Sequence, residues 1–119
     1  MVDGELADPL PQFPAFGYNE PMNRTVALET LRRSEQALRA RGVRRAALFG
    51  SVARGDNRPE SDVDIMVEID PAAHLTVYDY ADLKDYISGL FAGPVDVVNR
   101  DSLKAYIRPA ATADAIYAF

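Results

Sequence analysis

The sequence predicts an α/β domain in which helices flank a small mixed β-sheet, and three observations lead to this prediction. Segments with strand character, at residues 43–49, 62–69 and 95–98, are separated by helical patterns, so the order is helix, strand, strand, helix, strand, helix. This order is typical of helices packed around one sheet. A chain of 119 residues with 48% hydrophobic content suffices for one modest core and no more. We therefore expect a domain at residues 24–119, preceded by a proline-containing extension at residues 1–23.

The first predicted helix spans residues 25–42. Thr25 is a suitable cap at its beginning, Gly42 is a suitable stop, and Leu28, Leu31 and Leu38 lie near one face. This helix leads directly into the strand at residues 43–49, "VRRAALF".

The second predicted helix spans residues 75–91, between the strand at residues 62–69 and the strand at residues 95–98. Pro71 ends the preceding strand, and Gly93-Pro94 ends the helix. Weaker helical patterns follow at residues 102–108 and 110–118, separated at Pro109. The apolar end of the chain, "AIYAF", fits either a helix packed on its own sheet or a segment docked on a partner.

Aspartates occupy one face of the second and third predicted strands. Alternate strand side chains share a face, so the apolar residues of "DVDIMVEI" point to the core while Asp62 and Asp64 point away, roughly 7 Å apart at their Cα atoms. By the same alternation Asp96 points away from the core in "VDVV". If these two strands are neighbours, the carboxylates of Asp62, Asp64 and Asp96 converge at one end of the sheet.

Three close carboxylates repel one another, and a divalent cation relieves that repulsion. Mg²⁺ prefers hard oxygen ligands and keeps positions open for substrate phosphates, and a pair of such ions can hold both oxygens of an in-line displacement. The alternative, ordinary exposed aspartates at strand ends, is the more common meaning of an isolated Asp-Val-Asp.

The residues before the aspartates favour phosphate chemistry. Gly50-Ser51 directly follows a strand, where a tight turn would lead into a short helix. Gly50 lets a phosphate approach the backbone, and Ser51 supplies an N–H and a hydroxyl. Arg54 lies one turn later, where it can meet a phosphate or brace an aspartate, and Gly55 permits a second turn.

Residues 50–67, "GSVARGDNRPESDVDIMV", resemble the signature of the polymerase-beta-like nucleotidyltransferases. That signature is Gly-Ser, ten residues, Asp-x-Asp and a later aspartate between hydrophobic residues, here Val95-Asp96-Val97. The elements Ala53–Asp56 and Ser61-Asp62 resemble the minimal nucleotidyltransferase (MNT) group most closely. The resemblance covers about residues 26–108 and leaves the extension unexplained.

The resemblance implies a role for each residue of the motif. Asp62 and Asp64 are expected to bind Mg²⁺, two ions in all, while Asp96 completes the metal site and helps to activate the acceptor hydroxyl. Gly50 and Ser51 are expected to hold the phosphates of ATP, with support from Arg54.

Many MNT proteins are antitoxins paired with a HEPN-domain ribonuclease toxin, and they are associated with transfer of AMP from ATP to a toxin tyrosine. The resemblance therefore implies a Mg²⁺-dependent protein adenylyltransferase with a HEPN partner. The length agrees, because the motif occupies nearly the whole chain, so the acceptor surface must come from a second protein or a homodimer partner. Two alternatives remain open: an antitoxin that acts by binding alone, and an enzyme that modifies a small molecule.

Composition excludes several other classes. The chain has no cysteine, so a disulfide framework, a thiolate metal site and a cysteine nucleophile are excluded, and a cytoplasmic location is expected. The acidic N-terminus lacks the apolar run of a signal peptide, and no segment has the roughly 20 apolar residues of a membrane helix. The net charge of -5 argues against a dedicated nucleic-acid binder.

Charge is unevenly distributed along the chain. Residues 24–45 hold seven arginines against two glutamates, a local charge of +5, so the remainder carries -10. This basic segment is either a solvated helix face or a patch for an acidic partner.

Other polar and aromatic residues are expected to have structural roles. His74 is expected in a loop or cap, and Glu68 in solvent further along the strand from the aspartates. Tyr78, Tyr80 and Tyr86 lie on or beside the second helix, and we expect them to pack on the domain.

Overall fold

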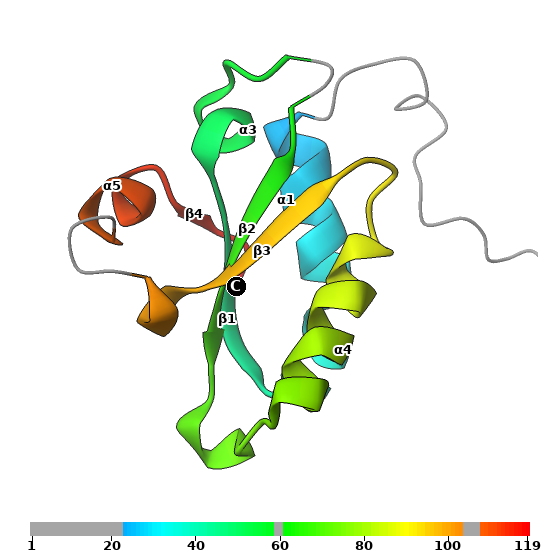
Figure 1. Cartoon of the computed structure of the whole chain (residues 1–119). Coiled ribbons are helices and arrows are strands. Elements are labelled where there is room, and N and C mark those ends of the chain that lie inside the picture. Colours follow the sequence, from blue (N-terminus) through cyan, green and yellow to red (C-terminus); the bar gives the residue numbers. More distant parts are fainter. Residues whose placement is uncertain (1–22, 59–60, 104–107) are drawn as a thin grey trace, which may run out of the picture.

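A four-stranded mixed sheet forms the centre of the computed structural model, which describes residues 23–58, 61–103 and 108–119 (Figure 1). The strand order is β3-β2-β1-β4, in which β1 is Val43–Phe49, β2 is Val63–Ile69, β3 is Val95–Asn99 and β4 is Ile116–Tyr117. Both β2 and β4 run antiparallel to β1, whereas β3 runs parallel to β2. The predicted α/β class and the adjacency of the second and third strands are confirmed. Residues 1–22 of the predicted extension lie outside the described residues.

The first predicted helix is two helices, α1 at Arg24–Arg33 and α2 at Glu35–Ala40. The chain departs from helical geometry at Ser34, whose N–H donates to the Leu31 carbonyl at 3.1 Å. Serine competes with helix hydrogen bonding through its own side chain, so it is a natural break. The predicted cap is also wrong, because the Asn23 side chain, rather than Thr25, accepts from the Val26 N–H at 2.9 Å.

The second predicted helix is α4, Val77–Ser88, which begins two residues later than expected because Thr76 caps it. Thr76 Oγ1 accepts from the Asp79 N–H at 3.1 Å, and the Asp79 carboxylate accepts from the Thr76 N–H at 3.0 Å. This reciprocal pair is a capping box. The short 3-10 turn η3, Pro71–Ala73, precedes it, and His74 lies in the following loop at φ 50, as predicted.

One face of the sheet, here the helical face, packs against α1, α2 and α4. Figure 1 shows α1 and α4 on the same side of the sheet and α5 on the other. The helices and three of the strands contribute buried side chains to this core: Ala27, Leu28, Leu31, Leu38, Val43, Ala46, Leu48, Val52, Ala53, Val63, Ile65, Val67, Leu83, Ile87, Leu90, Phe91 and Val97. In β2 these are the alternate apolar residues that the sequence assigned to the core.

The predicted tyrosine packing holds for two of the three residues. Tyr80 and Tyr86 are half-buried against the core, and the Arg41 guanidinium lies 3.9 Å from the centre of the Tyr86 ring. Tyr78 is 82% exposed, so its predicted packing is wrong. It belongs to the first turn of α4.

The end of the chain is a strand, whereas a helix over residues 110–118 was predicted. After the 3-10 turn η4, Arg100–Ser102, the short helix α5 occupies Arg108–Ala113, and β4 then pairs with Ala47 and Leu48 of β1. Pro109 lies within the first turn of α5 rather than separating two helices, because that turn requires no N–H from it. The predicted helix at residues 102–108 falls largely outside the described residues.

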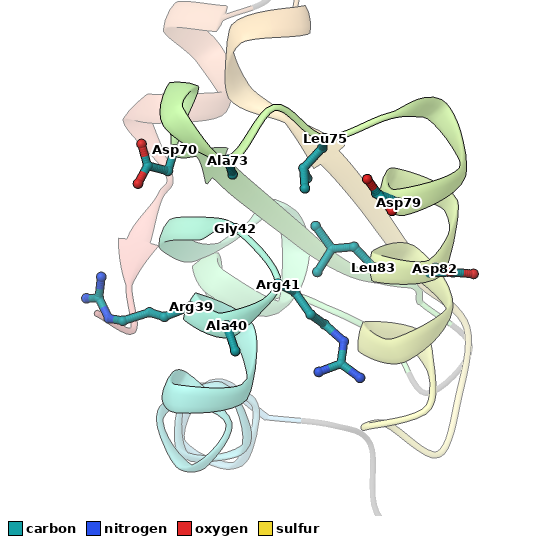
Figure 2. Close-up of a pocket in the computed structure, with 10 residues that line it drawn as sticks. All are labelled: Arg39, Ala40, Arg41, Gly42, Asp70, Ala73, Leu75, Asp79, Asp82 and Leu83. Atoms are coloured by element: carbon teal, nitrogen blue, oxygen red, sulfur yellow. The ribbon is translucent and has the colours of Figure 1, made fainter.

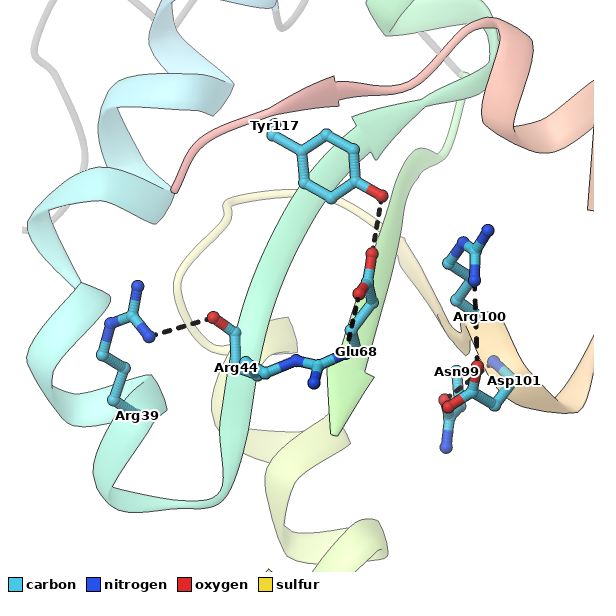
Figure 3. A network of polar contacts seen from close by, with 7 residues as sticks. All are labelled: Arg39, Arg44, Glu68, Asn99, Arg100, Asp101 and Tyr117. Carbon is cyan, nitrogen blue, oxygen red and sulfur yellow. Dashed lines mark hydrogen bonds and ion pairs between the residues drawn. The ribbon is translucent and has the colours of Figure 1, made fainter. Parts of the chain in front are cut away.

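The other face of the sheet, here the carboxylate face, carries Asp64 and Glu68 of β2 and Asp96 of β3. Glu68 is buried, contrary to its predicted exposure, because Tyr117 of β4 covers it. The Tyr117 hydroxyl donates to Glu68 Oε2 at 2.6 Å, and Arg44 Nη2 donates to Oε1 at 3.4 Å (Figure 3).

The basic segment is more than a solvated helix face, because several of its arginines hold the last residues of the chain. Arg32 Nε donates to the Ala118 carbonyl at 3.2 Å. The guanidinium of Arg45 lies 3.8 Å from the Tyr117 ring centre, and that of Arg39 lies 4.9 Å from the ring centre of the terminal phenylalanine. Cation–π contacts of this kind add to the two-residue strand pairing. Within the described residues, no helix is long and apolar enough to cross a membrane.

The polar contacts of Glu68 shift its titration. Burial alone would raise the pKa of this carboxyl group, but hydrogen bonds from Tyr117 and Arg44, together with the charges of Arg100 and Arg45, bring its pKa below the ordinary value. The ionised carboxylate therefore stabilises the folded state at neutral pH.

Replacing Tyr117 with Phe is expected to lower the free energy of unfolding at pH 7 by about 1–3 kcal/mol, because a buried carboxylate loses a donor. The native pKa of Glu68 lies below its unfolded value near 4.5, so this contribution is full above that pH and is lost as the pH falls through the native pKa. Urea unfolding at pH 7 and in acid measures both effects.

The matched control is Tyr78→Phe, which removes the same hydroxyl from an exposed site and should leave the urea midpoint unchanged. Equal midpoints for the two variants would contradict the role given to the contact between Tyr117 and Glu68.

Candidate active site

The short helix α3, Gly50–Arg54, begins where β1 ends and occupies the turn that the sequence predicted after Gly50-Ser51. Val52 and Ala53 are buried, so the helix is seated on the core. It ends at Gly55, whose φ of 85 lies in the left-handed region. The amides of Gly55 and Asp56 both donate to the Ser51 carbonyl, at 2.9 and 3.1 Å.

Gly50 has a positive φ of 75 and lies directly against the Asp64 side chain. A Cβ at this position would collide with Asp64 Oδ2 and would lie 3.0 Å from its Cγ. Because Phe49 pairs with Asp64 across β1 and β2, the residue after Phe49 necessarily passes this carboxylate. The glycine therefore serves two purposes, the backbone turn and room for the carboxylate.

Asp64 and Asp96 are register partners on the parallel strands β2 and β3. Their side chains lie on the carboxylate face, and Asp62, which immediately precedes β2, lies on the same side by strand alternation. The structure thus brings the predicted residues Gly50, Asp64 and Asp96 to one end of the sheet.

The charges at this end of the sheet affect one another. Partial burial raises the pKa of Asp64 above its ordinary value, and the neighbouring charges of Asp96 and Asp62 raise this pKa further, while Arg54 lowers it. Asp64 is therefore the residue on which the electrostatic effects of the predicted site residues converge.

The chemistry of this donor set suits a hard divalent cation, because Asp62, Asp64 and Asp96 offer only carboxylate oxygens and their mutual repulsion would be relieved by positive charge. Within residues 23–58, 61–103 and 108–119, however, no three acidic, histidine or cysteine side chains lie close enough together to hold a metal ion. The predicted full convergence of the three side chains is therefore not seen, although their backbone positions are adjacent.

Ser51 is partly buried at the second position of α3, whereas Arg54 lies at its exposed end. Arg54 braces aspartates, one of its two predicted roles, although neither is a predicted site residue. Its Nη1 lies 2.8 Å from Asp114 Oδ2, and its Nε lies 3.1 Å from Asp56 Oδ2. These two hydrogen bonds raise the pKa of Arg54 above its ordinary value.

Asp114 is a site-proximal residue that the sequence did not reveal. It lies 60 positions from Arg54, in the segment predicted as part of a helix over residues 110–118. A single aspartate near the end of a chain gives no signal of such a contact, and only the fold brings it beside α3.

A pocket of about 570 Å³ lies at the opposite end of the sheet, beside Gly42 at the beginning of β1 and Asp70 at the end of β2 (Figure 2). Its charged lining residues are Arg39, Arg41, Asp70, Asp79 and Asp82. The seven residues of β1 separate Gly42 from Gly50, so the pocket lies roughly 20 Å from Gly50. It is therefore separate from the predicted site.

Comparisons with known proteins show the family to which this chain belongs. The nucleotidyltransferase domain family matches residues 31–118. A Methanocaldococcus jannaschii protein named for protein adenylyltransferase activity is 35% identical over 91 residues, which cover 75% of this chain and 91% of that protein. The protein adenylyltransferase MntA of Thermococcus cleftensis is 34% identical over 76 residues, which cover 64% of this chain and 75% of MntA.

Solved structures show the same fold. A structure described as a minimal nucleotidyltransferase has a TM-score of 0.61 and 34% identity, with coverage of 82% of this chain and 98% of that chain. A chain from the complex of a tri-AMPylated Shewanella oneidensis HEPN toxin with an MNT antitoxin has a TM-score of 0.55 and 18% identity, with coverage of 77% and 71%. At this low identity the second likeness concerns the fold alone.

Replacing Gly50 with Ala is expected to lower the free energy of unfolding by about 1–3 kcal/mol, because a side chain at positive φ is strained and Asp64 must move away from the new Cβ. Chemical denaturation measures the loss. Gly93→Ala is the matched control, because nothing lies within 4 Å of a Cβ there, and it should be nearly neutral. Equal losses in both variants would show that the contact between Gly50 and Asp64 does not constrain the turn.

Replacing Asp64 with Asn is expected to stabilise the metal-free protein at pH 7 by up to about 1 kcal/mol, a small gain because solvent screens a partly exposed charge. The native pKa of Asp64 is raised above its unfolded value near 3.8, so its ionisation weakens folding increasingly as the pH rises through that interval. The gain should be absent at pH 3, where both states are protonated. Thermal unfolding of this variant and of Asp82→Asn at both pH values tests this; a loss of stability for Asp64→Asn at pH 7 would contradict the repulsion.

Proposed function

This chain belongs to the nucleotidyltransferase domain family, and from that premise we propose that it is an antitoxin that transfers AMP from ATP to a tyrosine hydroxyl of a HEPN toxin. The observation that carries the proposal is the register of Asp64 with Asp96 on adjacent parallel strands, directly beside Gly50. This arrangement supports a site in which a donor phosphate and an acceptor hydroxyl meet at one end of the sheet.

The donor is held at the beginning of α3. Gly50 has no side chain, so a phosphate oxygen can approach its backbone, and Ser51 offers an N–H and a hydroxyl. The same glycine leaves room for the Asp64 side chain, so the proposed donor site lies next to the carboxylates.

Asp62 and Asp64 are the residues proposed to hold Mg²⁺, with Asp96 completing the site. When bound, the cation supplies positive charge that offsets the carboxylates and the triphosphate. A raised pKa at Asp64 is consistent with a carboxylate whose ionised form needs such an opposite charge.

Asp96 is proposed to orient the acceptor hydroxyl and to take up its proton. The transfer forms a bond between the tyrosine oxygen and the α-phosphorus and breaks the bond to diphosphate. Positioning and charge stabilisation account for most of the rate enhancement in such a reaction. A small site on one face of the sheet therefore suffices if the partner contributes the nucleophile.

The names of similar proteins, and a solved complex with the same fold, support a HEPN toxin as the acceptor. Two adenylyltransferases by name are similar to this chain over most of their length, and the fold recurs in a complex with an AMPylated HEPN toxin.

The proposal is tested by incubating the protein with the HEPN toxin, ATP and Mg²⁺ and measuring intact masses. We expect one or more added AMP masses on a toxin tyrosine, and a loss of about 10²–10⁴-fold in rate for Asp96→Asn, in line with removal of a base or metal ligand. Asp82→Asn, which lines the pocket at the opposite end of the sheet, is the matched control and should transfer normally.

Neutralisation of the toxin without a mass change, equally by wild type and by Asp64→Asn, would instead support an antitoxin that acts by binding alone. Transfer to a small molecule such as an aminoglycoside, with the toxin unmodified, would support the small-molecule alternative.

A further inference from the structure

The helix α3 is too short to hold its own orientation. It has five residues, and isolated helices of that length have little intrinsic stability. Val52 and Ala53 fix its inner side in the core. On its outer side, Arg54 reaches out from the last position, so the contacts of this side chain affect where the rest of the helix lies.

Arg54 contacts two carboxylates that differ in their connection to the rest of the fold. Asp56 is two residues away in the same turn, so it moves together with α3. Asp114 is 60 residues away and follows α5, so it joins α3 to a separate part of the structure. The contact to Asp114 is also the shorter one, at 2.8 Å against 3.1 Å, and its carboxylate is the less exposed, at 33% against 61%.

Asp114 is itself held in place by the residues that follow it. The Ala115 N–H donates to the Thr112 carbonyl at 3.2 Å, and β4 begins at Ile116. The Tyr117 hydroxyl is bound to buried Glu68, and the N–H of the next residue, Ala118, donates to β1 at 2.8 Å. The carboxylate is thus attached to the central sheet within a few residues of chain.

We infer that Asp114 is a positioning residue: by holding Arg54 it keeps α3 in the orientation that places Gly50 and Ser51 beside Asp64 for the donor nucleotide. The inference rests on the proposed transferase function of this site. Of the two roles predicted for Arg54, it favours the contact with aspartates, because a guanidinium already engaged by two carboxylates orients the helix rather than binding the donor.

The test compares Asp114→Asn with Asp56→Asn, since each removes one carboxylate from Arg54 and only the first removes the link to the sheet. The readouts are amide hydrogen exchange at Gly55 and Asp56, whose N–H groups report on α3, and calorimetric affinity for an ATP analogue that cannot be cleaved at the α-phosphate. Asp114→Glu, which keeps the charge, tests for rescue. Melting temperatures control for unfolding.

For Asp114→Asn we expect faster exchange at these amides and about 3- to 10-fold weaker nucleotide affinity, with a melting temperature within a few degrees of wild type. Asp56→Asn should remain within about 2-fold of wild type in affinity, and Asp114→Glu should recover most of the loss. This pattern supports the inference.

Unchanged exchange in Asp114→Asn, equal effects of the two asparagine variants, or tighter nucleotide binding once Arg54 is released would each overturn it. If the wild-type protein binds no nucleotide, the proposed function fails, and the exchange measurement then decides alone whether Asp114 holds α3.

Discussion

The register of β2 with its two neighbours is the constraint on which the candidate site depends. Antiparallel pairing of Phe49 with Asp64 forces the chain to turn directly against that carboxylate, and parallel pairing with β3 puts Asp96 on its other side. A shift of β2 or β3 by one residue would move the aspartate of that strand to the helical face. The alternating apolar residues of β2, buried under α1 and α4, prevent such a shift, so the core determines the geometry of the site.

This arrangement lowers the stability of the folded state at the proposed site. The pKa of Asp64 is raised by burial and by the negative charges of Asp96 and Asp62. The ionised carboxylate is therefore less favourable in the folded state than in the unfolded chain. A positive φ at Gly50 adds a backbone conformation that other residues adopt only with strain. The rest of the domain offsets these costs through its core and through the C-terminal strand, whose Tyr117 satisfies Glu68 on the same face of the sheet. Strain and repulsion confined to one end of a stable sheet are common features of functional sites.

The sequence was sufficient for the centre of the fold and insufficient for its edges. The alternation in "DVDIMVEI" and the Gly-Ser turn predicted β2, α3 and the face that carries the aspartates, because these patterns are local. The C-terminal strand could not be predicted, since two residues carry no periodicity and β4 is held by arginines and by Glu68 from distant segments. The burial of Glu68 and the contact between Arg54 and Asp114 depend on this same strand, so they were missed for the same reason. The break at Ser34 was also missed, because the apolar spacing of α1 and α2 continues across it.

We propose that Asp62, Asp64 and Asp96 act together on one nucleotide at this end of the sheet. The most direct measurement is a crystal structure with Mn²⁺ and a non-hydrolysable ATP analogue, in which anomalous scattering locates the metal. We expect a Mn²⁺ peak bound by Asp62 and Asp64, with the triphosphate against Gly50 and Ser51 and the α-phosphate facing Asp96. A nucleotide bound instead in the pocket beside Gly42 and Asp70, or a metal that contacts none of the three aspartates, would contradict it.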